Sequence, residues 1–297
     1  MASTGYTGYR GYRGRPYHPP QRTARKRHPW LRRIFIYAAL FGLWWFNNYA
    51  LRTDHTSLRS DKIKEPFRAV IIADQHASEN SISNDKILSR IDNAEPDIIF
   101  VLGDMYSRDS TWEEIKKPIG LMSDLTAKGY PVYFVTGDHD KGGDYLLALK
   151  SARIRIMDYR TDVVDIKGNS LQIMGIDSVS YSDNFDLSTA FTRDPASFSI
   201  LLAHIPNYRA FSAFGADLTL CADTHGGMTR LPFLGPVLDT EDMTLFPKLK
   251  EGKEIYDKGW FDYEGGSMFI TSGIGASPLP IRFWNRPEVV VMDIEPL

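Results

Sequence analysis

Residues 70–76 run Val70-Ile71-Ile72-Ala73-Asp74-Gln75-His76, an apolar segment that ends in a carboxylate and an imidazole. Short apolar, β-branched runs of this kind are typical of buried strands. Four further runs have the same form, at residues 98–104, 135–140, 201–204 and 220–225. Ligands bind outside the carboxyl ends of strands in open α/β sheets. The five runs therefore predict that several polar side chains meet at one edge of the sheet structure.

The histidines follow this pattern closely. Only four lie beyond position 55, and each closes one of the runs: His76, His139, His204 and His225. The fifth run ends on Asp104 instead. A single histidine is most often a hydrogen-bonded structural residue, but four of four at predicted strand ends favour a metal site built from imidazoles and carboxylates.

Taken together, the runs resemble the calcineurin-like metallophosphoesterases. That family carries Asp-x-His, Gly-Asp-x-x-Asp, Gly-Asn-His-Asp/Glu, a lone His and Gly-His-x-His, in this order. The matching residues here are Asp74 and His76, then Gly103 and Asp104, then Gly137, His139 and Asp140, then His204, and finally His225. The C-terminal stretch at residues 273–283 and 286–289 also resembles the branch of the family that has an N-terminal membrane segment.

The resemblance implies a fold, a ligand set and a reaction. The fold would be a four-layer αββα sandwich of the α/β class. A first metal would be held by Asp74, His76, Asp104 and His225, and Asp104 would bridge to a second metal held by Asp138, His204 and Asp223. His139 would face the substrate and Asp140 would orient its imidazole. Two divalent ions sharing a hydroxide would then hydrolyse a phosphodiester, phosphomonoester or pyrophosphate.

Three positions depart from the family pattern. Asp138 stands where the family has Asn, Asp223 where it has the first His of Gly-His-x-His, and Ser107 where it usually has Asp or Asn. The first two changes replace one kind of ligand by another, and oxygen-rich sites favour harder ions. We therefore expect Mn, Mg or Fe rather than Zn. The alternative is a catalytically inactive protein that binds metal or phosphate on the same fold.

Charge divides the chain into two parts. Residues 1–53 contain ten Lys or Arg and no Asp or Glu, whereas the rest contains 25 Lys or Arg against 37 Asp or Glu. An acidic catalytic domain argues against nucleic acid as a substrate. Residues 1–29 are rich in Gly, Tyr, Pro and basic residues, so we expect a disordered tail. A third hypothesis makes this tail an interaction segment and the domain its passenger.

Residues 34–51 are almost entirely apolar, and we expect a membrane anchor helix over 30–52. These eighteen residues would span about 27 Å as a helix, slightly less than the ~30 Å hydrocarbon core. Trp30, Trp44, Trp45 and Tyr49 suit interfacial anchoring, and the basic residues before the helix favour a cytoplasmic tail and a catalytic domain outside. The short span and Asn47-Asn48 leave an interfacial helix on the cytoplasmic face as the alternative.

The remaining boundaries follow from periodicity. Residues 53–66 are expected to be a linker and 67–297 the metallophosphoesterase domain. The predicted helices are 84–93, 111–127 and 143–151, and the predicted strands are 68–73, 97–102, 131–136, 162–167, 170–175, 198–203, 217–222, 267–272 and 288–293. The apolar loop 228–238 favours a lipid-linked substrate, and a nucleotide-linked substrate is the alternative. Arg230 and Arg282 are candidate phosphate contacts.

Overall fold

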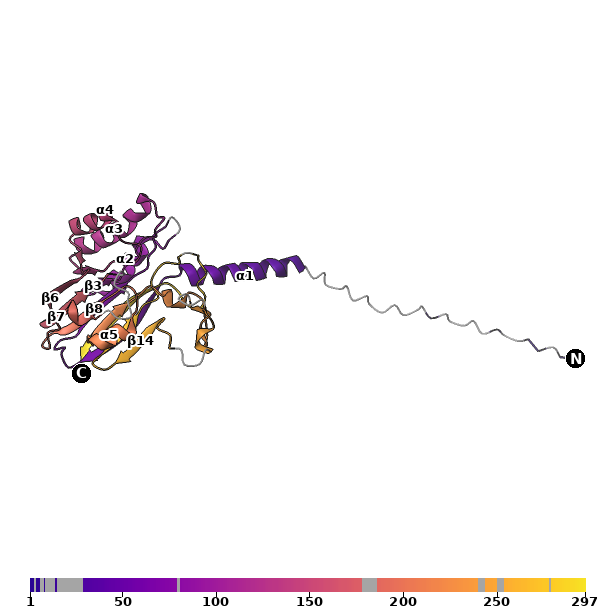
Figure 1. Ribbon diagram of the computed structural model, residues 1–297. Coiled ribbons are helices and arrows are strands. Elements are labelled where there is room, and N and C mark those ends of the chain that lie inside the picture. Colours follow the sequence, from indigo (N-terminus) through magenta and orange to yellow (C-terminus); the bar gives the residue numbers. More distant parts are fainter. Residues whose placement is uncertain are drawn as a thin grey trace. The chain divides into compact units, whose positions relative to one another are not determined.

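The computed structural model describes residues 29–78, 81–177, 186–239, 244–249, 254–277 and 279–297, with a few positions before residue 29 (Figure 1). The expected disordered tail at 1–29 lies almost wholly outside these described residues. The chain divides into two units, Met1–Ala39 and Leu40–Leu297. The second unit holds both sheets and every predicted site residue.

Two six-stranded sheets form this unit. The first has the order β1-β16-β2-β3-β4-β5, in which β2, β3, β4 and β5 run parallel. Its strands are β1 (Arg52–Ser60), β16 (Glu288–Pro296), β2 (Phe67–Ile72), β3 (Ile98–Val101), β4 (Val132–Phe134) and β5 (Arg155–Ile156). The predicted strands 68–73, 97–102, 131–136 and 288–293 are present in this sheet, whereas β5 was not predicted.

The second sheet has the order β14-β15-β9-β8-β7-β6, with β15, β9, β8 and β7 parallel. Its strands are β14 (Gly259–Tyr263), β15 (Gly266–Ile270), β9 (Leu218–Cys221), β8 (Phe198–Leu202), β7 (Asn169–Gly175) and β6 (Arg160–Ile166). Two short ribbons lie outside both sheets: β10 (Arg230–Leu231) with β11 (Gly235–Pro236), and β12 (Leu238–Asp239) with β13 (Thr244–Leu245).

The hydrophobic core consists of three buried clusters, and their positions between the sheets and helices define the architecture. One buried cluster joins the facing sides of the two sheets, through residues such as Ile71 and Phe100 of the first and Ile200 and Leu220 of the second. A second cluster joins the outer face of the first sheet to α2, α3 and α4, and a third joins the outer face of the second sheet to α5. Helices thus cover both outer faces (Figure 1), and the four-layer αββα arrangement is confirmed.

The three predicted helices are present as α2 (Asn84–Ala94), α3 (Trp112–Ala127) and α4 (Gly143–Ser151). Thr111 begins α3 with a capping box, because its side chain accepts from the Glu114 N–H while the Glu114 carboxylate accepts from the Thr111 N–H. The helix α5 (Tyr208–Phe214) was not predicted, and short 3₁₀ turns occur at Leu187–Thr189, His225–Gly227 and Pro247–Leu249. With only seven residues, α5 is too short for a clear helical period.

The expected linker at 53–66 was wrong for most of its length. Residues 52–60 form β1, which pairs in parallel with β16 from Arg52–Glu288 to Ser60–Pro296. This strand has a half-buried, alternating pattern rather than an apolar run, and it is an edge strand. Its partner lies 236 residues away, so no local signal marks the pairing.

The apolar segment before β1 is the helix α1 (Pro29–Tyr49). Among the described residues, none of the helices combines the length and the hydropathy needed to cross a membrane. Within residues 40–49, Leu40, Phe41, Trp44 and Trp45 are exposed, whereas Asn47 and Asn48 are buried. These two asparagines thus mark a contact with the domain.

That contact joins the end of α1 to the C-terminal loop. The Asn47 Oδ1 accepts from the Trp284 N–H at 2.9 Å, and the Asn48 Oδ1 accepts from the Arg282 N–H at 2.8 Å. The Trp44 indole donates to the Pro280 carbonyl at 2.7 Å. Residues 40–49 are therefore part of the folded unit.

Candidate metal centre

The site lies where parallel strands of both sheets end. Asp74 and His76 follow β2, Asp104 follows β3, and His139 follows β4. From the second sheet, His204 follows β8, and Asp223 and His225 follow β9. Because the two sheets face each other, their carboxyl ends deliver these side chains to one place, as the sequence predicted.

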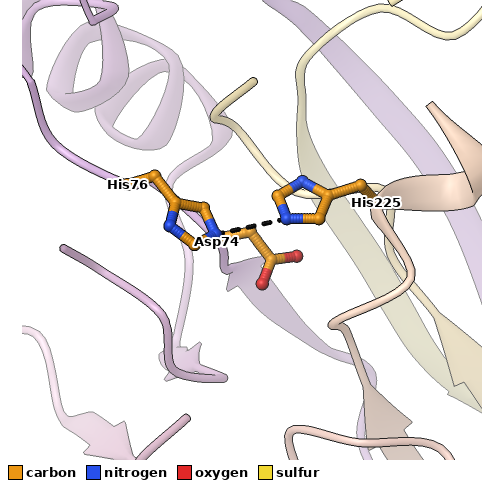
Figure 2. A group of neighbouring side chains, drawn as sticks. All are labelled: Asp74, His76 and His225. Carbon is orange, nitrogen blue, oxygen red and sulfur yellow. Dashed lines mark hydrogen bonds between the residues drawn. The ribbon is translucent and has the colours of Figure 1, made fainter. Parts of the chain in front are cut away.

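Three overlapping groups of potential ligand atoms form there, each with its atoms within 4.8 Å of one another. They are Asp74, His76 and His225; His76, Asp104 and His139; and Asp74, Asp104 and His204. Figure 2 shows the first group, in which the Nε2 atoms of His76 and His225 face each other at 3.2 Å beside the Asp74 carboxylate. Asp74, His76 and Asp104 each belong to two of the groups. The Asp104 carboxylate lies 3.8 Å from His76 and 3.3 Å from His204, one predicted ligand of each ion, as expected of a bridging ligand.

The buried carboxylate of Asp74 tests whether a metal fits. Asp74 is fully buried, and neither of its carboxylate oxygens has a hydrogen-bond partner among the described residues. Burial raises the pKa of Asp74 to about 8. A buried, unpaired carboxylate costs several kcal/mol, and a divalent cation held with His76 and His225 would remove that cost. The donor set therefore fits a metal ion.

Contacts at the Nδ1 atoms of two imidazoles orient these rings for metal binding. The Nδ1 atom of His76 lies 3.1 Å from the Ser107 hydroxyl, and the Nδ1 of His204 donates to the Leu102 carbonyl at 2.6 Å. A hydrogen bond at one ring nitrogen leaves the other free as a ligand. Burial lowers the pKa of His76 to about 4, so this imidazole is neutral near neutral pH.

The second-sheet side of the site concentrates negative charge around His204. Its Nε2 lies 3.3 Å from the Asp104 carboxylate and 3.4 Å from that of Asp223. Burial lowers the pKa of His204, but the neighbouring carboxylates of Asp104 and Asp223 outweigh burial and raise it well above its usual value. A positive charge, either a proton or a metal ion, is therefore favoured at this nitrogen.

The backbone is strained at the same residues. Five of the seven predicted metal ligands have left-handed φ angles of +41° to +67°: Asp74, His76, Asp104, Asp223 and His225. Such conformations are uncommon outside glycine and cluster at functional sites. Gly103 and Gly137 allow the loops after β3 and β4 to approach each other closely. A Cβ on Gly103 would lie 2.4 Å from the Gly137 nitrogen, and one on Gly137 would lie 2.1 Å from the Asp104 carboxylate.

Not every predicted residue joins the cluster. The Asp138 side chain is exposed, and neither Asp138 nor Asp223 belongs to any of the three ligand groups found among the described residues. Arg230, the candidate phosphate contact, is ion-paired with Asp257 and donates to the Gly226 carbonyl. Arg282 is also committed, because its guanidinium is buried and donates to the Ser272 and Gly275 carbonyls.

The expected role of Asp140 was wrong. Its carboxylate is fully buried and accepts from the Met105 N–H at 3.0 Å and the Gly137 N–H at 3.2 Å, so it holds two loops together. The His139 imidazole is instead oriented by the Arg108 N–H, which donates to its Nδ1 at 2.9 Å. This hydrogen bond places the ring proton on Nε2, which lies 3.7 Å from the Asp104 carboxylate.

Several supporting residues had no usable signal in the sequence. Ser107 was noted only as a departure from the family pattern, yet it contacts the His76 ring. Gly273 has a left-handed φ of +65°, and a Cβ there would lie 2.5 Å from the Asp74 carboxylate. The glycines of the C-terminal motif could have been recognised as a place where the backbone passes close to another group. The sequence does not show that this group is the Asp74 carboxylate.

Comparison with known proteins agrees with this geometry. The family model of the calcineurin-like phosphoesterases matches residues 67–227, more than half of the chain, and the chain belongs to that family. The match includes every predicted metal ligand. Members of the family bind divalent metal ions, and the protein is accordingly a metal-dependent phosphoester hydrolase.

Three relatives cover most of the chain. The metallophosphoesterase YkuE of Bacillus subtilis (strain 168) is 26% identical over 254 residues, which are 82% of this chain and 85% of YkuE. The phosphodiesterase YaeI of Escherichia coli (strain K12) is 26% identical over 77% of this chain and 82% of its own. A metallophosphoesterase of Aquifex aeolicus (strain VF5) is 24% identical over 88% of this chain and 98% of its own.

Proposed function

We propose that the protein hydrolyses phosphodiesters with two divalent metal ions and acts at a membrane surface. The observation that carries the hydrolytic proposal is the buried Asp74 carboxylate, whose two oxygens lack partners and lie beside the Nε2 atoms of His76 and His225. YaeI is a phosphodiesterase by name, and that favours diesters over monoesters for this chain.

Each residue has a distinct role in this proposal. Asp74, His76, Asp104 and His225 would hold the first ion, and Asp104, His204 and Asp223 the second. When bound, the ions supply charge that activates water and stabilises the phosphoryl oxygens. Asp138 is exposed, so the second ion would have fewer buried ligands and would bind more weakly than the first. The carboxylate-rich second set favours Mn, Mg or Fe over Zn.

His139 is proposed to donate a proton to the departing alkoxide. Its imidazole is part-exposed, and the Arg108 N–H occupies Nδ1, so Nε2 carries the proton on the side of Asp104. A positioned imidazole that donates at the leaving oxygen is a general acid, and such groups typically contribute 10²- to 10⁴-fold.

The membrane part of the proposal depends on exposed apolar and basic groups. Residues 40–46 of α1 expose Leu40, Phe41 and Trp45, and the C-terminal loop bound to α1 exposes Leu279, Ile281 and Trp284. Beside the end of α1, Lys86, Arg90 and Arg286 line a cavity of about 640 Å³ that also contacts Trp45. Apolar side chains beside cations suit a helix that lies in an anionic lipid interface.

The test is hydrolysis of bis(4-nitrophenyl) phosphate and 4-nitrophenyl phosphate by metal-free protein to which Mn²⁺, Mg²⁺, Fe²⁺ or Zn²⁺ is returned. We expect activity that needs metal and favours the diester. Metal binding must displace the proton of Asp74, whose pKa is about 8, so affinity should rise between pH 6 and pH 8. Metal-independent activity, or protein that binds metal without hydrolysing either ester, would overturn the proposal.

A further inference from the structure

The side chain of Arg282 is buried beside the metal centre and is bound by backbone carbonyls of the C-terminal loop. It is 2% exposed. Its Nε donates to the Gly275 carbonyl at 2.8 Å, and one terminal nitrogen donates to the Ser272 carbonyl at 2.6 Å. The other terminal nitrogen donates to the Asn285 carbonyl at 3.4 Å. The guanidinium therefore joins three points of the loop that are up to 13 residues apart in the sequence.

The first part of this loop, residues 272–275, lies directly against Asp74. The Gly275 N–H donates to the Asp74 carbonyl at 2.6 Å. A Cβ on Gly273, between the two carbonyls that Arg282 binds, would lie 2.5 Å from the Asp74 carboxylate. The backbone of residues 272–275 thus limits where that carboxylate can lie, and two hydrogen bonds from Arg282 hold that backbone.

Arg282 also contacts His225, another predicted ligand of the first ion. The nitrogen that donates to Ser272 lies 3.4 Å from the His225 Nδ1. A contact of this length is too long for a strong hydrogen bond, so it limits the place of the ring without deciding which ring nitrogen carries the proton. Asn285, whose carbonyl accepts from Arg282, donates through its side chain to the His225 carbonyl at 2.7 Å. Arg282 therefore supports both the ring and the backbone of His225.

The backbone of Arg282 is held in turn by Asn48, near the end of α1. Asn48 is buried, its Oδ1 accepts from the Arg282 N–H at 2.8 Å, and its Nδ2 donates to the Arg282 carbonyl at 3.2 Å. The neighbouring Asn47 is also buried, but it accepts from the N–H of Trp284, whose side chain is exposed. Of these two asparagines, Asn48 is the one that binds the residue beside the metal ligands.

We infer that Arg282 is a positioning residue of the first metal site, and that Asn48 holds it in place from α1. The inference rests on the proposed function, because that function assigns Asp74 and His225 to the first ion. The shape of the guanidinium matters here, since its N–H groups reach three carbonyls in different directions and a lysine ammonium does not have this fork. The printed hydrogen bonds of Arg282 reach none of the second-ion ligands, so the second ion should keep its affinity.

The test is a titration of metal-free protein with Mn²⁺, in which electron paramagnetic resonance of unbound Mn²⁺ gives the affinity of each site. Asp223→Ala identifies the second site by weakening it. Arg282→Lys keeps the charge but removes the fork, and it should weaken the first site at least about tenfold while the second site stays within about threefold. Arg286→Lys is the matched control, because Arg286 lies in the same loop and donates to the Ala50 carbonyl of the α1 end at 2.8 Å. It should leave both sites within about threefold.

The two asparagines extend the test to α1 and do not depend on whether Arg282→Lys folds. Asn48→Ala should weaken the first site about tenfold, whereas Asn47→Ala, which removes a similar hydrogen bond from the same helix, should weaken it less than about threefold. Equal losses in the two asparagine variants, or an unchanged first site in Arg282→Lys, would overturn the inference. Equal weakening of both metal sites would also overturn it, because Arg282 would then only stabilise the fold.

Hydrogen exchange of the metal-free protein separates failure of the inference from failure of the proposed function. In Arg282→Lys and Asn48→Ala, the amides of residues 225–228 and 272–277 should exchange faster than in wild type, whereas those of α4 should not. Unchanged exchange in both segments would overturn the inference even if the wild type hydrolyses phosphodiesters. If both variants behave as expected in the two experiments and the wild type hydrolyses no ester, the proposed function alone fails.

Discussion

At the scale of single residues, Asp104 and His139 are neighbours in the site, but we expect them to have different roles in metal binding and catalysis. Asp104 belongs to two of the three ligand groups, and burial, which would raise its pKa, is outweighed by His204, which holds that pKa below its usual value. We expect Asp104→Ala to lose both metal and activity. His139→Ala should keep its metal and lose about 10²- to 10⁴-fold in kcat, as measured by elemental analysis and 4-nitrophenolate release.

The sharpest contradiction would be a His139→Ala protein that retains activity within a few-fold of wild type, because the imidazole would then not act as the acid. If that variant instead loses one equivalent of metal, His139 is a ligand. Its Nε2 lies in the same ligand group as His76 and Asp104, so elemental analysis decides between the two roles.

Gly273 gives a second prediction at this scale. A methyl group there would lie 2.5 Å from the Asp74 carboxylate, and the residue has a φ of +65°. Gly273→Ala should displace Asp74 and weaken metal binding at least tenfold in a metal titration. Gly168→Ala is the matched control, because Gly168 has a φ of +81° but no atom near its Cβ position. Both variants incur the ~1–2 kcal/mol of left-handed strain, and only the first should lose metal.

At the scale of elements, Glu288 joins β16 to its surroundings. Its buried carboxylate pairs with Arg52 of β1 and with Lys258, and it accepts from the Ser272 N–H at 2.9 Å. Burial raises the pKa of Glu288, but Lys258 and Arg52 outweigh burial and lower it from 4.5 to about 2. The ionised carboxylate is therefore favoured in the folded protein, where it holds the loop that covers Asp74.

The pH dependence of stability follows from this shift. A carboxyl group with a lowered folded pKa stabilises the protein above its unfolded pKa of 4.5 and loses that contribution as the pH falls toward 2. The shift corresponds to about 3 kcal/mol. Urea unfolding of the metal-free protein should show this loss between pH 5 and pH 2. Glu288→Gln should unfold more easily at pH 7 and show a flatter pH dependence, whereas Glu295→Gln, at a surface pair on the same strand, should follow wild type.

At the scale of the whole molecule, the proposed membrane surface combines the end of α1 with the cations beside it. Flotation with vesicles should show binding of residues 40–297 to anionic vesicles, with less binding to neutral ones and at high salt. Phe41→Ser should weaken binding through lost apolar contact, and Lys86→Glu with Arg90→Glu should remove the preference for anionic lipid. Leu147→Ser, an equally exposed position on α4, is the control. Equal loss in the control, or no binding by wild type, would contradict the membrane surface.

Much of this fold was accessible from local pattern. Apolar runs predicted β2, β3, β4, β7, β8, β9 and β15 but not the parallel edge strands β1 and β5, and helical periodicity predicted α2, α3 and α4 with their approximate ends. The order of the ligand motifs predicted which side chains would meet, because parallel strands place their carboxyl ends at one edge. Each strand or helix signal is local, and the motif order can be read directly along the chain, which is why the sequence was sufficient for these features.

What the sequence determined by itself is therefore the fold class and the chemistry of the site: strands that end on imidazoles and carboxylates. The tertiary structure alone decided that β1 pairs with β16, that Asp138 is exposed, and that Asp140 holds loops rather than His139. The pairing of β1 with β16 joins Arg52 to Glu288, and Asp140 accepts from Met105, a residue of another loop. Hydrogen-bond partners and burial are determined only when the sheets pack together, and the local hydrophobic periodicity of the sequence does not predict them.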